Sequence, residues 1–438
     1  MFSRLKEQVR LIFLEDRARY YFATLQHAKA IPFLEEALEM RPDHLVLLEM
    51  EAWARYYADE YNHCLEALDD IWELTKGKVS SDWHHCRGMA LHALGNYKEA
   101  ITEYNRGVDM TRNPNPILYS RSLAYHKDGQ YEMAALDLTH SIKHLEFSVT
   151  VWRKAAQIFQ DANRHVEVME LMAELRRRQI NDPEDLLMTG KSATFLEDNN
   201  RASEAYGWVI DMLEKADEQA PLEPGELRIL AEAYEGVKDA QGVLYALERL
   251  ESADQLDPQD RIVRVKAFEM EGDYYAALED VSQALDEEVL PEWLYLRARL
   301  HAQLGNWEDA LSDTDAALDL RPADPSTLSL RGLVKVERGD LEGAYTDIRY
   351  ALGLDRGLAE GYLNLGRYFM ALGKYQHAWL ELESAYSLDP ELRHIHFFRG
   401  ATLFELGRNE EAFEELQISK ELGDPEAETF IRTYFFMG

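Results

Sequence analysis

The side chains best suited to chemistry gather in the segment DWHHCRGMALH, residues 82–92. His85 and His92 lie seven residues apart, so in a helix they share one face, and His126 takes the place of His92 in the next stretch of similar sequence. Three imidazoles on adjacent helices could bind a transition metal. Histidine on a polar and aromatic surface is more often a hydrogen-bonding residue. We therefore predict no metal and no cofactor.

Catalytic signatures are missing from the sequence. It has no G-x-x-x-x-G-K-[ST], G-x-S-x-G, H-E-x-x-H or C-x-x-C motif. Its two cysteines, Cys64 and Cys86, cannot form a disulfide framework and suit a reducing compartment. Nothing in the sequence recommends either of them for a redox role. We predict a protein that is not an enzyme.

The overall composition limits the cellular compartment and the classes of partner that the chain can have. The 438 residues carry a net charge of −34, and a polyanion repels phosphate backbones, so we expect no nucleic-acid binding. Apolar runs such as LIFL at 11–14 stop after a few residues, whereas a bilayer span needs about 20. The N-terminal stretch has neither the apolar core of a secretory signal nor the acid-free composition of a transit peptide. We predict a cytoplasmic protein without a membrane span.

A basic island stands out in this acidic chain. Its members are Arg153, Lys154, Arg164, Arg176, Arg177, Arg178 and Lys191. Basic charge at a helix C-terminus is favourable by a few tenths to about 1 kcal/mol, which is one explanation. The other explanation is a patch that binds an acidic partner.

The elements that must position these groups repeat every 33 or 34 residues. A glycine of an L-G-x-aromatic type of turn, with alanine five residues later, recurs seven times, at Gly95, Gly129, Gly272, Gly305, Gly339, Gly373 and Gly407. Five further units place other residues in the two slots: Leu25 with Ala30, Asp59 with Cys64, Asn163 with Val168, Asn200 with Ala205 and Lys238 with Val243. The sequence therefore predicts twelve units.

Each unit carries two apolar patterns of helical period on either side of the turn, which predicts a pair of helices. Glycine can end the first helix in the left-handed conformation. An aromatic residue then holds the second helix against the first, and the small residue lets the two helices approach closely. Between Asn163 and Lys238 the spacing stretches to 37 and 38 residues.

These patterns give the following domain organisation. We expect a capping segment at 1–10, units one to five at 11–182, an irregular unit with longer loops at 183–223, units seven to twelve at 224–424 and a capping helix at 425–438. The irregular unit could be a hinge, or its loops could leave the stacking unchanged. Tyr434, Phe435, Phe436 and Met437 either dock on the last unit or form an association surface.

A second regularity predicts ion pairs inside the units. In six units an arginine is followed by an acid sixteen residues later, which places the two on the facing helices of one pair. The pairs are Arg87 with Glu103, Arg121 with Asp137, Arg264 with Asp280, Arg297 with Asp313, Arg331 with Asp347, and Arg399 with Glu415. Removing one member would leave the other charge buried and unpaired.

The unit at 359–392 carries the most complete set of these residues, among them Gly366, Gly373, Tyr375, Ala378 and Pro390. With this pattern the chain resembles the tetratricopeptide repeat family over roughly residues 11 to 425. The resemblance implies an all-α fold, a right-handed α-solenoid of about twelve helix pairs with terminal capping helices. Stability in such an array comes from the stacking of neighbouring units.

The resemblance also implies a concave groove, lined by positions 2, 5, 9, 12 and 13 of each first helix. Near the N-terminus these positions give Trp53, Tyr56, Tyr57, His85, Met89, His92, Tyr119 and His126; towards the C-terminus they give Tyr295, Arg299, Leu363, Arg367, Met370, Phe397 and Phe404. Some of these side chains could instead pack against the neighbouring helix. The Lys and Asn set with which some members clamp a chaperone's terminal carboxylate is absent.

We predict a scaffold or adaptor without catalysis, whose groove holds a peptide or helix of a partner protein. One alternative is a sensor in which a ligand bends the superhelix. The other is a structural protein that self-assembles, with a homo-oligomer formed through the C-terminal tail.

Overall fold

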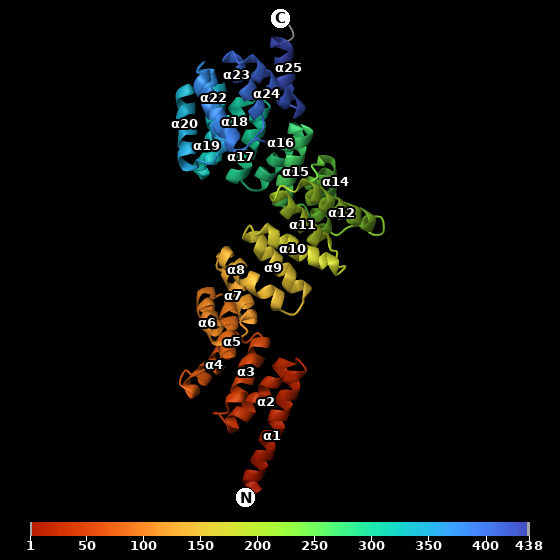
Figure 1. Ribbon diagram of the computed structural model, residues 1–438, viewed down its shortest axis with the longest axis vertical. Coiled ribbons are helices and arrows are strands. Elements are labelled where there is room, and N and C mark those ends of the chain that lie inside the picture. The colour runs from red at the N-terminus through yellow and green to blue at the C-terminus, as the bar shows by residue number, and fades with distance from the viewer. Residues whose placement is uncertain (1, 436–438) are drawn as a thin grey trace. The chain divides into compact units, whose positions relative to one another are not determined.

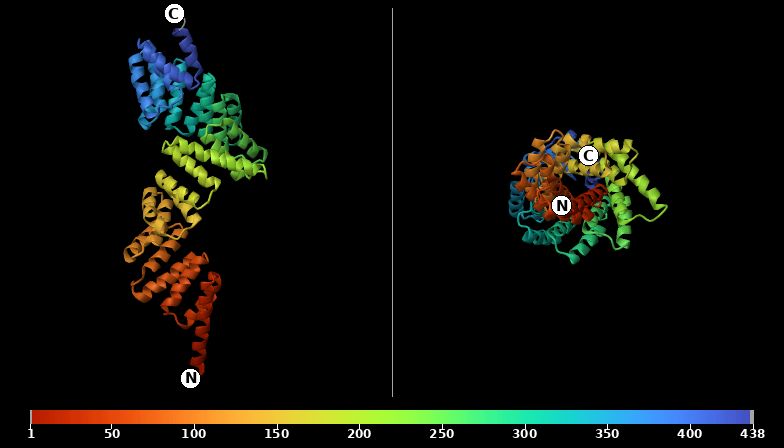
Figure 2. Two further views of the ribbon diagram at one scale, coloured as in Figure 1. Left: turned by 45° about the vertical axis from the view of Figure 1, so that its right-hand side comes forward. Right: turned by 90° about the horizontal axis from the view of Figure 1, so that it is seen from below.

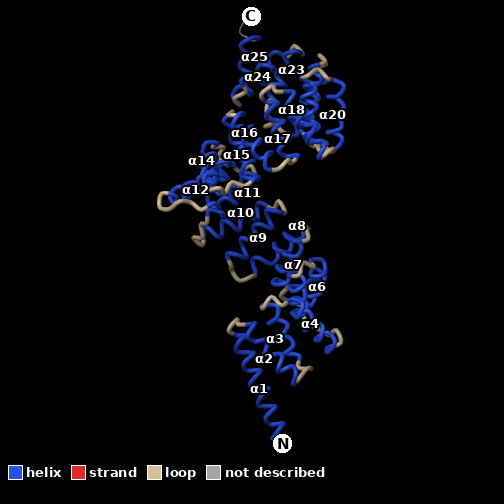
Figure 3. Tube along the Cα trace, turned by 180° about the vertical axis from the view of Figure 1, so that it is seen from behind, coloured by secondary structure: helices blue, strands red, loops and turns tan. Residues whose placement is uncertain are grey.

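A computed structural model of the chain describes residues 2–435, with the side chains of residues 6–435. The described part contains twenty-five α-helices and no strand (Figures 1 and 3). The helices group into two compact units, unit 1 (Met1–Gln219) and unit 2 (Ala220–Gly438). None of the described helices combines the length and the apolar character that a bilayer span requires.

Unit 1 is a succession of six helix pairs in chain order. They are α1 (Phe2–Ala23) and α2 (His27–Met40), α3 (Leu45–Tyr57) and α4 (Tyr61–Thr75), α5 (Ser81–Ala93) and α6 (Tyr97–Met110), α7 (Asn115–Lys127) and α8 (Tyr131–Ser141), α9 (Val149–Asp161) and α10 (His165–Arg177), and α11 (Pro183–Phe195) and α12 (Asn199–Asp217).

Unit 2 contains six more pairs and a last helix, which follow one another from green to blue in Figure 2. They are α13 (Pro224–Gly236) and α14 (Ala240–Ser252), α15 (Pro258–Glu271) and α16 (Tyr274–Glu287), α17 (Pro291–Gln303) and α18 (Trp307–Leu320), α19 (Pro325–Glu337) and α20 (Leu341–Leu354), α21 (Ala359–Ala371) and α22 (Tyr375–Leu388), α23 (Ile395–Glu405) and α24 (Asn409–Glu421), and α25 (Pro425–Tyr434). The solenoid of twelve pairs is confirmed.

The turn between the two helices of a pair has the left-handed residue that the sequence predicts. All seven turn glycines have φ between 70° and 83°, and Leu25, Asp59, Asn163 and Lys238 take the same conformation without being glycine. In the sixth pair the assignment of Asn200 is wrong, because Glu197 is the left-handed residue there, with φ of 58°. The spacing from Asn163 to Glu197 is therefore a regular 34 residues. Within the stretch from Asn163 to Lys238, all the extra length therefore lies after Glu197.

The small residue five positions after the turn is buried as predicted. The alanines of the seven glycine-containing pairs are all 0% exposed, as are Ala30, Cys64 and Val168. Glycines inside the first helices allow an equally close approach: a Cβ added to Gly332 would lie 2.4 Å from Cγ1 of Ile348 in the facing helix. Overpacking therefore limits both positions.

The ion pairs inside the units are confirmed in five of the six cases. Arg121, Arg297 and Arg331 each donate two hydrogen bonds of 2.7 to 2.8 Å to the predicted aspartate. Arg264 also donates two hydrogen bonds to Asp280, and Arg399 lies 2.9 Å from Glu415.

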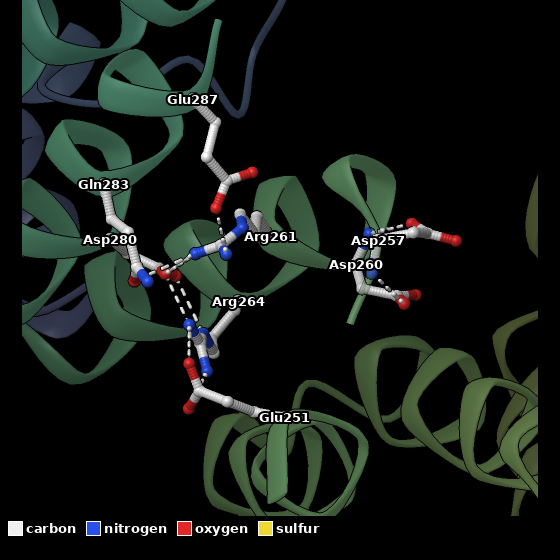
Figure 4. A network of polar contacts seen from close by, with 8 residues as sticks. All are labelled: Glu251, Asp257, Asp260, Arg261, Arg264, Asp280, Gln283 and Glu287. Atoms are coloured by element: carbon white, nitrogen blue, oxygen red, sulfur yellow. Dashed lines mark hydrogen bonds and ion pairs between the residues drawn. The ribbon is translucent and has the colours of Figure 1, made fainter. Parts of the chain in front are cut away.

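Figure 4 shows the most buried of these pairs, on α15 and α16, where Arg264 lies between Asp280 and Glu251 of α14. Burial of the Arg264 guanidinium lowers its pKa, but the hydrogen bonds to the two carboxylates outweigh that effect and raise the pKa overall.

The predicted pair of Arg87 with Glu103 is wrong. Arg87 contacts Asp69 on the preceding pair at 2.5 Å. Glu103 is instead taken by His84 at 2.7 Å and by Arg106 at 2.8 Å. Two closer side chains of the same helix pair therefore occupy this carboxylate.

The two ends of the chain differ from each other. Residues 2–10 are the start of α1, which continues to Ala23 without a break at residue 10. At the other end α25 packs on α24, with Ala427 and Ile431 buried, and the rings of Phe404 and Phe435 lie 5.5 Å apart. Phe435 therefore docks on the last pair. Tyr434 contacts the Phe404 ring at 5.3 Å but is 55% exposed, and Phe436 and Met437 lie outside the described residues.

Candidate functional site

The first helices of successive pairs form the inner face of unit 1. Contacts join α1 to α3, α3 to α5, and α5 to α7, so neighbouring first helices touch in addition to the contacts within each pair. A curved stack is concave on the side where its neighbouring elements converge. The side chains that project from these four helices away from their partners therefore lie on the side where the sequence predicts a groove.

Aromatic side chains form a continuous ridge on this face. We call Trp53, Tyr56 and Tyr57 of α3, with His27 and His85, the aromatic ridge. The rings of Trp53 and Tyr57 are stacked at 5.8 Å, and His27 stacks on Tyr57 at 4.5 Å. Edge-to-face contact at 6.4 Å links Trp53 to His85 of α5. Tyr57 is 51% exposed, whereas Trp53 and Tyr56 are partly buried against the core of unit 1, so the ridge offers a ligand mainly the ring of Tyr57.

The ridge is electrically neutral near pH 7. Burial lowers the pKa of His85 to about 4, against a smaller opposing effect of the Asp82 carboxylate, and Nε2 of His85 lies 2.8 Å from the Ser120 hydroxyl. Burial raises the pKa of Tyr56 to about 12. A ridge of this kind binds through area and ring faces rather than through its own charge.

Lowering the pH should reduce the free energy of unfolding of unit 1, because His85 is harder to protonate in the folded chain than in the unfolded one. An unfolded histidine takes up its proton near pH 6.5, whereas His85 in the folded chain does so only near pH 4. Between these values the unfolded state binds more protons, so stability falls as the pH falls. We expect a loss of about 2 kcal/mol at pH 5 from this group.

Chemical denaturation of the wild type and of His85→Gln at pH 7 and pH 5 measures this loss. The variant should lose about 2 kcal/mol less than the wild type. His27 and His92, whose pKa values burial also lowers, are present in both proteins and act as the internal control. An equal loss in both proteins would show that His85 is not the group responsible.

The other sequence-predicted residues of this face are held by neighbours. Met89 and Tyr119 are partly buried against the core of unit 1. His92 and His126 each pack edge-to-face on the tyrosine that opens the following second helix, at 5.4 and 5.5 Å. Nε2 of His126 also lies 2.6 Å from Asp161.

The metal interpretation of the histidine group has no support in the geometry. Among the described residues no group of three or more His, Cys, Asp or Glu side chains is arranged to hold a metal ion. The two cysteines are buried free thiols on α4 and α5, with their sulfur atoms 3.8 Å apart. Contact with Cys64 and burial raise the pKa of the Cys86 thiol far above its usual value, so Cys86 is a poor nucleophile.

The inner face of unit 2 is more polar and is largely engaged within the chain. Arg299 binds Glu269 at 2.6 Å, and Arg367 binds Glu337 at 2.7 Å, so each arginine is paired with an acid on the preceding first helix. Burial lowers the pKa of Arg367 and raises that of Tyr295.

The remaining candidates of unit 2 lie in packed surroundings. Leu363 is buried, and Phe397 packs edge-to-face on Phe430 of α25 at 6.1 Å. Arg393, just before α23, donates a hydrogen bond to the Tyr274 hydroxyl at the start of α16. This contact joins residues 119 apart in sequence.

The basic island is largely neutralised by acids of the same unit. Arg153 grips Asp185 with two hydrogen bonds of 2.8 Å, and Arg177 and Arg178 both pair with Glu174. Arg164 pairs with Glu167, and the Arg176 guanidinium lies 3.5 Å above the Trp208 ring. The remaining members are Lys154, which binds Gln157, and Lys191. A role in binding an acidic partner stays a prediction.

His27 belongs to the ridge, but the sequence did not predict it there. The predicted groove positions all lie on first helices, whereas His27 opens the second helix α2. A signal was available. His27 occupies the first position of α2, where Tyr97 and Tyr131 stand at the start of α6 and α8, so its ring could have been expected at the junction of two pairs.

Two family models described as tetratricopeptide repeat match the chain, one at residues 264–325 and 363–427 and the other at residues 14–44 and 87–114. No curated protein sequence matches.

Solved structures with a similar arrangement include a tetratricopeptide repeat protein from Parabacteroides merdae, with 18% identity, coverage of 57% of this chain and 97% of that one, and a TM-score of 0.46. The complex of Cut9 and Hcn1 has 15% identity, coverage of 97% and 96%, and a TM-score of 0.40. Yeast Tom70 has 14% identity, coverage of 90% and 98%, and a TM-score of 0.38.

Proposed function

Because this chain is a tetratricopeptide repeat protein, we propose that it works as a scaffold or adaptor without catalysis, which holds a peptide or helix of another protein in the groove of its first helices. The observation that carries this proposal is the aromatic ridge of unit 1. Aromatic residues dominate the binding energy of protein interfaces, because they bury a large area at a small cost in conformational entropy.

Unit 1 is a better candidate for the main site than unit 2. In unit 1 the stacked rings of Trp53, Tyr57 and His27 leave Tyr57 half-exposed. In unit 2 the equivalent face is occupied by ion pairs between neighbouring helices, such as Arg299 with Glu269 and Arg367 with Glu337. A partner would have to compete with these pairs, whereas on the ridge it has only water to displace.

A peptide-display library of random sequence, panned on the full chain, tests the proposal. We expect recovered peptides to bind the wild type and to be lost from Trp53→Ala/Tyr57→Ala. The control variant is Tyr275→Ala, which removes an aromatic ring that is 74% exposed on a second helix, α16. Peptides retained equally by all three proteins, or no recovered peptide at all, would contradict a peptide-binding ridge.

A further inference from the structure

Two carboxylates lie beside the aromatic ridge. Glu49 precedes Trp53 by one turn on α3, and Asp82 precedes His85 by about one turn on α5. Both residues are exposed. They lie close enough together that Asp82 raises the pKa of Glu49, adding to the larger effect of partial burial. Like charges placed side by side repel each other, so the pair carries unfavourable energy that a cation would relieve.

Neither carboxylate is neutralised by the part of the chain that the structure describes. No ion pair joins Glu49 or Asp82 to a described lysine or arginine, in contrast to three other acids near α3. Arg55 of that helix binds Glu35, Glu51 and Glu60, each at 2.8 Å.

The lysine and arginine side chains on the neighbouring first helices do not neutralise Glu49 and Asp82. Lys127 of α7 acts on His92, which is ten residues beyond Asp82 on α5, or about 15 Å along the helix. Arg19 of α1 is not among the groups that shift the pKa of Glu49, which are burial and the Asp82 carboxylate. The negative charge at Glu49 and Asp82 is therefore available to a cation of a bound ligand.

The spacing along α3 sets the length of a ligand. Glu49, Trp53 and Tyr57 are each separated by one turn, so carboxylate and ring faces line up over eight residues, or about 12 Å. An extended peptide covers that distance with about four residues. A cationic side chain placed over Glu49 can thus be followed, three or four residues on, by a side chain over Tyr57.

We propose that Glu49, Asp82 and the aromatic ridge form a docking site for an extended peptide that carries lysine or arginine, with the cation held between the two carboxylates and the face of Trp53, and an apolar or aromatic side chain placed over Tyr57. This rests on the proposed function and names the chemistry of the partner. A cation gains from both neighbours, because carboxylates attract it directly and the ring face does so through its quadrupole. The net charge of −34 draws basic partners towards the chain over a longer range.

The test extends the peptide display to two charge variants. Glu49→Gln/Asp82→Asn removes the two groove carboxylates. The matched control, Glu66→Gln/Asp70→Asn, removes two exposed carboxylates of α4, a second helix. Peptides whose capture needs Trp53 should be rich in lysine and arginine, and they should be kept by the control and lost from Glu49→Gln/Asp82→Asn.

Fluorescence anisotropy then measures the affinity of one recovered peptide in its labelled form. We expect the groove variant to bind it about fivefold more weakly than the control does, which corresponds to a combined contribution of about 1 kcal/mol from the exposed ion pairs that are lost. Raising the salt concentration from about 0.05 M to about 0.5 M should weaken wild-type binding more than binding to the groove variant.

The possible results separate the two proposals. Trp53-dependent peptides without an excess of basic residues, or with unchanged affinity for the groove variant, overturn the basic-peptide site and leave the scaffold intact. The absence of any Trp53-dependent peptide removes both. If sedimentation shows self-association that the groove variant abolishes, the occupant is a second copy of the chain, and the proposal of a separate basic partner fails.

Discussion

Replacing Asp280 with alanine is expected to lower the free energy of local unfolding of α15 to α18 by about 3–5 kcal/mol. Asp280 is one of the least exposed carboxylates in the chain, with 3% of its side chain exposed, and it accepts hydrogen bonds from both Arg261 and Arg264. Without it, two guanidinium groups remain buried, and their exposed partners Glu287 and Glu251 replace the lost attraction only in part (Figure 4).

Hydrogen exchange of the amides in α15 to α18 measures this loss locally, which suits a repeat array that need not unfold in a single step. Glu287→Gln removes an exposed acid from the same network and should cost less than about 1 kcal/mol. The triple replacement Arg261→Met/Arg264→Met/Asp280→Leu should recover much of the stability, because it removes both guanidinium groups together with the carboxylate that they share. If Asp280→Ala were as stable as Glu287→Gln, losing the buried Asp280 carboxylate would cost no more than losing an exposed one, and the account of the buried ion pair would be wrong.

Replacing Tyr104 with alanine should destabilise unit 1 by about 3–5 kcal/mol, the usual cost of emptying a large aromatic site in a core. Tyr104 is fully buried on α6 and packs so closely on α5 that a Cβ added to Gly88 would lie 2.5 Å from its ring. Its ring also lies 6.0 Å from that of His85, so the same substitution should loosen the aromatic ridge from below.

Chemical denaturation gives the stability, and anisotropy with a peptide recovered on the wild type gives the effect on the site. Tyr104→Phe keeps the ring and should lose about 1 kcal/mol or less, with binding unchanged. If Tyr104→Ala were as stable as Tyr104→Phe, the close packing between α5 and α6 would not be a source of stability.

The repeat was predictable because its determinants are local. A residue that must be left-handed and a small residue that must lie between two helices recur at fixed spacing, and backbone conformation and contact distance confirm both. The same rule failed in the sixth pair, where Glu197 takes the left-handed position with φ of 58°. With no glycine to mark the turn, the alignment slipped by three residues to Asn200 and divided the extra length over two joins.

Side-chain partners were less predictable than the backbone. The spacing of sixteen residues found five ion pairs, but it could not show that His84 and Arg106 would take Glu103 from Arg87. Likewise, the groove positions located Trp53 and Tyr57 but not His27, which reaches the ridge from a second helix. The contact of Arg393 with Tyr274 depends on how several pairs stack, which no local pattern contains.

The central claim is that the aromatic ridge of unit 1 binds a peptide, and a direct titration tests it most simply. A labelled peptide selected on the wild type is titrated with wild type, Trp53→Ala/Tyr57→Ala and Tyr275→Ala, each first shown to be folded by its helical circular dichroism. We predict that the ridge variant binds at least about thirtyfold more weakly, as expected when hot-spot residues of about 2 kcal/mol are removed, while Tyr275→Ala binds like the wild type. Equal affinity for all three proteins would contradict the account and place the binding site outside the ridge.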